Sequence, residues 1–141
     1  MHPIPANTTV LLVDDQPFMR EVMRSVLQDY KDVQIVGEAS DGVEAIQYAR
    51  MLKPHVVLMD INMPQMDGVQ ATSVIKKEDP ETIIIGLSIV EPGPISHALL
   101  QAGATTYLDK ECILDDLYPT ISRCLDRSVL PGQPSKQPWS L

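Results

Sequence analysis

The sequence has no apolar run that approaches the ~20 residues needed to cross a bilayer. Its first residues, Met1 to Asn7, contain neither a basic segment nor an apolar core, so they do not resemble a secretory signal. The chain is therefore expected to remain in the cytoplasm.

Cysteine is scarce. Cys112 and Cys124 are the two cysteines, and no Cys/His cluster has the spacing of a zinc site. In a cytoplasmic protein both are expected to be free thiols. They also fall in one predicted helix, at a spacing that cannot form a disulfide unless the helix unwinds.

An excess of positive charge is also missing. The chain has 11 Lys and Arg against 19 Asp and Glu, with a formal net charge of −8. Because nucleic-acid affinity comes largely from Lys and Arg, this chain alone is expected to bind DNA poorly. The acidic excess fits a solvated surface, carboxylates gathered at a cation site, or both.

Apolar segments and helical patterns alternate five times along the 141 residues. Strands are predicted at residues 8–13, 33–38, 56–60, 82–87 and 105–108, and helices at about 17–30, 42–52, 69–78, 95–102 and 113–127. Pro119 is expected to kink the last helix without ending it. The alternation predicts one α/β domain with a five-stranded parallel sheet and helices on both faces. We expect its strands to follow the flavodoxin-like order 2-1-3-4-5.

The domain is expected to span residues 8–127. Residues 1–7 form a short N-terminal extension. Residues 128–141 are rich in proline and polar residues, which predicts a linker or disordered tail. The sequence does not indicate whether Trp139, near the end of this tail, packs against the domain.

The segment Val56–Met59 consists of four consecutive apolar residues, which is typical of a central strand buried on both faces. Asp60 ends this strand. Polar residues also end three other predicted strands: Asp14 and Asp15, Ser88, and Lys110. In open α/β sheets the carboxyl ends of neighbouring strands meet in one crevice, so these side chains are expected to converge.

Crowded carboxylates repel one another, so Asp14, Asp15 and Asp60 are expected to share a cation. Hard oxygen ligands favour Mg²⁺, and the backbone carbonyl of Asn62 is a further candidate ligand. Asp60 is the candidate nucleophile for a phosphoryl group. In isolation, Asp14 and Asp15 could instead cap the first helix.

Two further side chains have predicted roles at this site. Lys110 is expected to pair with Asp60 at rest and with a phosphoryl oxygen afterwards. Ser88 is expected to donate a hydrogen bond to the same group, although it could be a simple turn former. No chemistry is assigned to Asp67, which is expected to form a loop turn with Gly68.

Over residues 8–127 the sequence closely resembles the receiver domain of two-component response regulators. The resemblance depends on an ordered set of segments: Leu11-Leu12-Val13-Asp14-Asp15-Gln16-Pro17, Ile35–Ala39, Asp41-Gly42, Val56–Gly68 and Gly103–Lys110. The residues around Asp41 and Asp60 look most like receivers that precede a LuxR-like helix-turn-helix output domain.

The resemblance implies phosphoryl transfer from a histidine kinase to Asp60, with Mg²⁺ required. It also implies that Ser88 and Tyr107 act as a coupled switch, although Tyr107 could simply pack in an edge strand. The fourth helix, fifth strand and fifth helix would then form the surface that changes. This surface could serve for homodimerisation or for contacts with an output domain that binds DNA and controls transcription.

Two features depart from the family pattern. Receivers usually carry a small residue after the switch hydroxyl, whereas this chain has Ile89, which is expected to crowd the phosphoryl entrance. Pro92, Gly93 and Pro94 are expected to stiffen the start of the fourth helix.

Four alternatives remain open from the sequence. One is a pseudo-receiver, which folds without being phosphorylated, and another is a stand-alone receiver that acts by protein contact. A haloacid-dehalogenase-type phosphatase also uses an Asp nucleophile and Mg²⁺, but it needs an acid where this chain has Asn62. A flavodoxin-like nucleotide binder would need a glycine-rich loop in place of Asp14–Pro17.

Overall fold

The computed structural model describes residues 7–61, 63, 67–88 and 94–126. Strands and helices alternate in this order: β1 (Thr8–Val13), α1 (Pro17–Leu27), β2 (Val33–Ala39), α2 (Gly42–Leu52), β3 (Val56–Asp60), α3 (Gly68–Glu78), β4 (Ile83–Ser88), α4 (Pro94–Gln101), β5 (Thr106–Asp109), the 3₁₀ turn η1 (Lys110–Cys112) and α5 (Ile113–Leu125).

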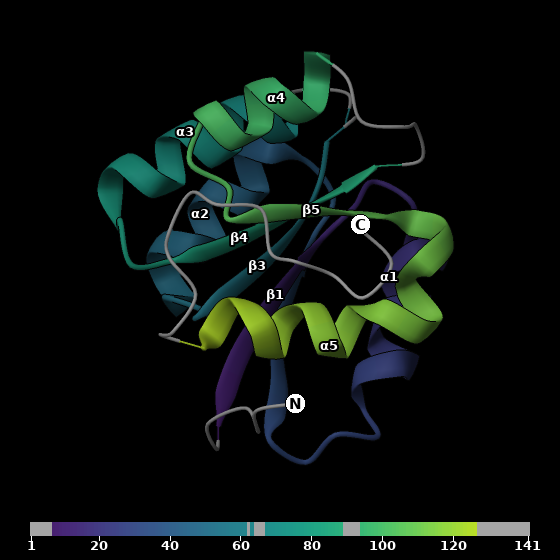
Figure 1. Ribbon diagram of the computed structural model, residues 1–141. Helices are drawn as coiled ribbons and strands as arrows, with labels where there is room; N and C mark the ends of the chain where they lie inside the picture. The colour runs from purple at the N-terminus through teal and green to yellow at the C-terminus, as the bar shows by residue number, and fades with distance from the viewer. Residues whose placement is uncertain (1–6, 62, 64–66, 89–93, 127–141) are drawn as a thin grey trace.

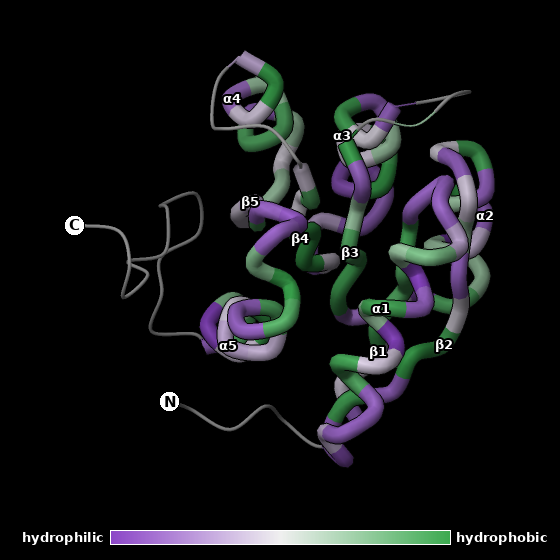
Figure 2. Tube along the Cα trace, turned by 90° about the vertical axis from the view of Figure 1, so that its right-hand side faces the viewer, coloured by the Kyte–Doolittle hydropathy of each residue, from purple (hydrophilic) through white to green (hydrophobic). Residues whose placement is uncertain are grey.

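The five strands form one parallel sheet in the order β2-β1-β3-β4-β5 (Figure 1). This confirms the fold class and strand order predicted from the sequence. Every residue of β3 is buried, as its unbroken apolar run predicts, whereas most residues of the edge strand β2 are only half-buried. The strands in the middle of the sheet are mostly green, hydrophobic segments in Figure 2.

Two hydrophobic clusters lie on opposite faces of the sheet. One joins inward residues of α1 and α5 to the sheet, including Met23, Leu27 and Leu117. The other joins α2, α3 and α4 to the opposite face, including Ile46, Ile75 and Leu99. This two-sided covering explains why the strands that share both clusters carry apolar residues without alternation.

The helix ends differ by a few residues from the predictions. The first helix ends at Leu27 rather than near Tyr30, because Tyr30 donates its amide to Leu27 in a turn and stacks its ring on Tyr118. The last helix ends at Leu125, and it continues through Pro119 as one helix. Gly103 follows α4 with φ +117°, a conformation that favours glycine at a helix end.

Both cysteines are free, as predicted. They do not lie in one helix, however, since Cys112 ends η1 and precedes the first residue of α5, while Cys124 lies in the last turn of α5. Burial raises the pKa of the Cys124 thiol to about 12. A thiol with so high a pKa stays protonated at neutral pH and is chemically inert.

No helix in the described ranges has the length and apolarity that a membrane span requires. The predicted tail, residues 128–141 with Trp139, lies outside the described residues. The same holds for all of the predicted N-terminal extension except Asn7.

Candidate functional site

The sheet register aligns the strand-end residues. Val13 of β1 pairs with Met59 of β3, so Asp14 follows β1 beside Asp60. On the other side, Asp60 pairs with Leu87 of β4, and Ser88 comes next along that strand. Ser88 in turn pairs with Asp109 of β5, and Lys110 follows. The polar residues that end β1, β3, β4 and β5 therefore occupy one end of the sheet.

Lys110 bridges two of the carboxylates. Its Nζ lies 2.9 Å from Asp14 Oδ2 and 3.2 Å from Asp60 Oδ1. Asp14 is fully buried, Asp60 is 2% exposed, and the Lys110 side chain is 11% exposed. Burial on its own lowers the pKa of Lys110, but the close contact with Asp14 and the charges of Asp60 and Asp14 outweigh it and raise that pKa. Lys110 is thus held as an ammonium by the acids around it.

The third acid, Asp15, completes an acidic cluster. Asp14, Asp15 and Asp60 each offer a carboxylate oxygen, and these oxygens lie within 4.8 Å of one another. Asp15 is exposed, whereas the other two are buried. Lys110 pairs with Asp14 and Asp60. With Asp15 the cluster has three carboxylates to this one ammonium, an excess of negative charge that a divalent cation could balance.

One oxygen of this cluster has unused acceptor capacity. Asp14 Oδ2 is buried and accepts no hydrogen bond of good geometry within the described part of the chain, although the charge of Lys110 lies beside it. The other oxygen, Oδ1, accepts from the amide of Gln16 at 2.9 Å. A buried carboxylate oxygen in this state fits Mg²⁺, which prefers oxygen ligands. The carbonyl of Asn62, the other predicted ligand, lies outside the described residues, as does Ile89.

Helix capping does not explain the two acids before α1. The N-cap residue of α1 is Gln16, which makes no side-chain capping bond, and Pro17 begins the helix. The side chain of Asp14 is buried, with Oδ1 on the amide of Gln16 and Oδ2 beside Lys110. The capping interpretation of Asp14 and Asp15 is therefore wrong for α1.

Two residues after β3 have roles that the sequence interpretation missed. Asp67 caps α3 by accepting a 2.8 Å hydrogen bond from the amide of Gln70. Gly68 lies so close to β3 that a Cβ there would be 2.2 Å from the carbonyl oxygen of Asp60. An Asp-Gly pair before an amphipathic helix was a signal for the cap, but nothing local indicated the backbone contact.

The predicted switch residues lie on adjacent strands. Ser88 is buried at the end of β4, and Tyr107 is half-buried in β5, opposite Gly86 of β4. Tyr107 packs against the hydrophobic cluster that includes Leu99 of α4. A Cβ at position 86 would collide with Leu99, so the glycine lets α4 pack closely on β4 beside Tyr107.

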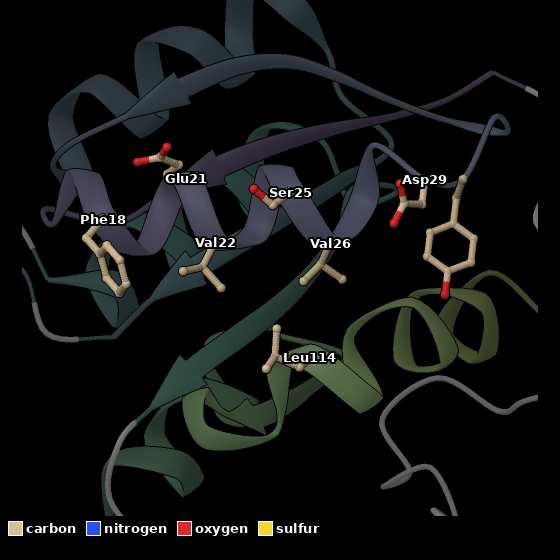
Figure 3. Close-up of a pocket in the computed structure, with 8 residues that line it drawn as sticks. Phe18, Glu21, Val22, Ser25, Val26, Asp29 and Leu114 are labelled. Atoms are coloured by element: carbon tan, nitrogen blue, oxygen red, sulfur yellow. The ribbon is translucent and has the colours of Figure 1, made fainter.

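A separate cavity of about 580 Å³ lies between α1 and α5 (Figure 3). Val22 and Val26 of α1 face Leu114 of α5 across it, and Glu21 and Asp29 lie along its length. Its lining includes none of the predicted site residues. The candidate chemistry is therefore at the strand ends and not in this cavity.

The fold and the acidic cluster define a doubly wound α/β domain with three acids that could hold a metal ion at the point where the strand order reverses. Residues 10–122 match the response regulator receiver domain family. The chain belongs to this family.

Among curated proteins, the chain is similar to the response regulator GacA of Pseudomonas protegens, with 38% identity over 124 residues that cover 88% of this chain and 56% of GacA. It is equally similar to the response regulator UvrY of Escherichia coli, with 38% identity over 124 residues that cover 88% of this chain and 55% of UvrY. The chain thus spans just over half the length of these relatives.

Solved receiver structures agree with the fold. The response regulator domain of Thermotoga maritima CheB is 31% identical, with a TM-score of 0.80 over 92% of this chain and 100% of that one. The receiver domain of RcsB from Salmonella enterica serovar Typhimurium, determined with the phosphomimetic BeF₃⁻, is 28% identical, with a TM-score of 0.76 over 83% of this chain and 87% of that one.

Proposed function

We propose that this chain is a phosphorylation-dependent receiver of a two-component system, in which Asp60 accepts a phosphoryl group from a histidine kinase. The observation that carries the proposal is the pair of buried carboxylates, Asp14 and Asp60, bridged by Lys110 at the end of the sheet. Buried charges of this kind destabilise a fold unless they are compensated, and they are typical of functional sites.

In this proposal Asp14, Asp15 and Asp60 hold Mg²⁺, and the carbonyl of Asn62 is a further predicted ligand. The spare acceptor capacity of Asp14 Oδ2 and the excess negative charge of the cluster support this ligand set. When bound, Mg²⁺ supplies positive charge that neutralises the phosphoryl oxygens.

The transfer step uses one carboxylate oxygen of Asp60. This oxygen forms a bond to phosphorus while the bond from phosphorus to the kinase's histidine nitrogen breaks, and the nitrogen keeps that electron pair. The products are an acyl phosphate on Asp60 and a free histidine. Lys110 turns from the Asp60 carboxylate to a phosphoryl oxygen, and Ser88 donates its hydroxyl to another.

The proposed response is a population shift. A Ser88 side chain held by the phosphoryl group leaves space that the ring of Tyr107 can enter, and the surface formed by α4, β5 and α5 changes with it. The close packing of α4 on β4 at Gly86, next to Tyr107, supports a mechanical connection between these elements.

The changed surface is proposed to act by homodimerisation or by contact with an output domain that binds DNA. The similarity to a LuxR-family two-component response regulator from Aurantimonas, 28% identical with a TM-score of 0.80, supports an output in transcription. That structure is matched over 86% of its own length and 85% of this chain.

The test is incubation with acetyl phosphate and Mg²⁺, followed by intact mass spectrometry. The wild type is expected to gain one phosphoryl group that EDTA prevents and hydroxylamine removes. Asp60→Asn should gain none. The control is Asp67→Asn, which changes the exposed acid that caps α3, and it should gain the phosphoryl group as the wild type does. A wild type that stays unmodified with both acetyl phosphate and a histidine kinase would instead identify a pseudo-receiver.

A further inference from the structure

Arg20 connects three segments at the rim of the acidic cluster. It lies in α1, and its side chain is 18% exposed. Its Nη1 donates a 2.6 Å hydrogen bond to the backbone carbonyl of Asp14, just after β1. Its Nε donates at 2.9 Å to Oε1 of Glu38 in β2. The guanidinium therefore holds the end of β1 from the side of α1.

The bond to Asp14 completes a set of three that fix this residue. The amide of Asp14 donates to the carbonyl of Ala39 at 3.0 Å, which extends the pairing of β1 with β2 by one residue. Its Oδ1 accepts from the amide of Gln16. With the amide, the carbonyl and Oδ1 engaged, Oδ2 is the oxygen that remains directed at Lys110 and the other acids.

We propose that Arg20 is a positioning residue for the Mg²⁺ site. By holding the carbonyl of Asp14 it sets the direction of Oδ2, so it acts on the cation through Asp14 and does not touch it. This inference rests on the proposed function, because it requires that the acidic cluster bind Mg²⁺. Groups that orient metal ligands in this way commonly change metal affinity about 10–100-fold when they are removed.

The charge of Arg20 has the opposite effect on Mg²⁺ affinity from its positioning role. A positive guanidinium near the cluster repels a cation, so its removal would strengthen Mg²⁺ binding if charge alone mattered. Glu38 opposes this repulsion: hydrogen bonds and charge from Arg24 and Arg20 hold the pKa of Glu38 below its usual value, although partial burial acts against them. Since Glu38 remains ionised beside Arg20, we expect the positional effect to be the larger.

Arg24 provides a matched comparison. It lies one turn after Arg20 on α1, and its Nε and Nη2 donate to Oε2 of the same Glu38, at 3.0 and 2.5 Å. Its described hydrogen bonds go to Glu38 and not to Asp14. Loss of Arg24 thus removes an arginine–Glu38 pair and one positive charge, but it keeps the bond to the Asp14 carbonyl.

The experiment measures Mg²⁺ binding to the whole chain by isothermal titration calorimetry, together with Tm, for the wild type, Arg20→Met, Arg20→Lys and Arg24→Met. Arg20→Met is expected to raise the Mg²⁺ Kd about tenfold. Arg24→Met is expected to lower Tm by about as much as Arg20→Met does, but to keep the Mg²⁺ Kd of the wild type. Arg20→Lys retains the charge but loses the planar fork that reaches two acceptors, so its Kd should follow Arg20→Met.

The inference is overturned if Arg20→Met binds Mg²⁺ as tightly as the wild type or more tightly. It is also overturned if Arg24→Met weakens binding equally, since the effect would then come from the charge around Glu38. If Arg20→Met does not fold, a wild-type Kd for Arg20→Lys overturns the inference in the same way. A wild type that binds no Mg²⁺ contradicts the metal site itself, which is a separate failure.

Discussion

The two ends of the parallel sheet differ in the kind of polar side chains that they hold and in how these are paired. At the amino end, the hydroxyl of Tyr118 donates to Asp32 at 2.7 Å, its ring stacks on Tyr30 with centroids 3.6 Å apart, and His55 pairs with Thr9. Tyr118 is buried and His55 is exposed, and each of them has a hydrogen-bond partner. At the carboxyl end, two buried carboxylates share the ammonium of the half-buried Lys110. The contacts at the amino end stabilise the fold. The carboxyl end instead holds buried charges that the stability of the fold does not require.

The largest loss of stability is expected from a substitution of Lys110. Lys110→Met leaves Asp14 and Asp60 buried without their ammonium, which should lower the free energy of unfolding by about 3–5 kcal/mol. Because a cation can replace the lost charge, millimolar Mg²⁺ should restore part of this stability. Urea denaturation with and without Mg²⁺ measures both effects. Lys77→Met, on the exposed face of α3, is the control; equal losses in the two variants would contradict a special role for the carboxyl end.

A substitution at Gly68 tests how closely α3 must approach the carboxyl end of β3. In Gly68→Ala the new Cβ would meet backbone atoms of Asp60 and Ile61 at 2.2 and 2.9 Å, so α3 or β3 must move. We expect a loss of about 1–3 kcal/mol by urea denaturation, together with weaker Mg²⁺ binding.

Gly37→Ala is the control for this substitution. Its Cβ would meet the tip of the Leu52 side chain, which can turn away, so its cost should be smaller. A harmless Gly68→Ala would mean that the backbone contact does not constrain the site.

At the amino end, Tyr118→Phe removes the hydrogen bond to Asp32 and keeps the ring that stacks on Tyr30. The expected loss is about 1 kcal/mol in urea denaturation, because a partly exposed hydrogen bond contributes little net stability. The Mg²⁺ Kd should not change. A shift in that Kd would show that the two ends of the sheet are coupled and not separate.

The smallest effect on stability is expected from Glu38, a half-buried acid at the rim of the carboxyl end. The pKa of Glu38 is lowered in the folded state, so its pairs with Arg24 and Arg20 stabilise the protein above the unfolded pKa of about 4.5. This contribution is lost as the pH falls through the lower folded pKa. About a third of the Glu38 side chain is exposed, so we expect less than about 1 kcal/mol.

The measurement is the difference in unfolding free energy between the wild type and Glu38→Gln from pH 7 downward. The advantage of the wild type should be constant to about pH 4.5 and then shrink. Glu81→Gln, at an exposed position before β4, provides the control. If the stability advantage of the wild type over Glu38→Gln grew as the pH fell, the pKa of Glu38 would be raised on folding and not lowered.

Much of this architecture follows from local sequence patterns. The unbroken apolar run of β3 and the five alternations of strand and helix predicted the parallel sheet, and the polar residues that end four of the five strands predicted that Asp14, Asp15, Asp60 and Lys110 meet. These predictions succeed because strand periodicity and parallel connections leave few arrangements.

Contacts between residues far apart in the chain were not predictable in the same way. Tyr30, beyond the end of α1, stacks on Tyr118, and the bond from Arg20 to the Asp14 carbonyl depends on how α1 lies against β1 and β2. Gly68 carries no local sign that it touches β3. Such features arise from packing between elements, which a pattern within one element does not specify.

Formation of a beryllofluoride complex, observed by ¹⁹F NMR, tests the central claim most directly, because this phosphoryl mimic requires both the acceptor carboxylate and the cation. We expect protein-bound fluoride resonances that need Mg²⁺, that are absent in Asp60→Asn and that remain in Asp67→Asn. Bound resonances that persist in Asp60→Asn, or a wild type that shows none at saturating Mg²⁺, would contradict the proposed phosphoryl site.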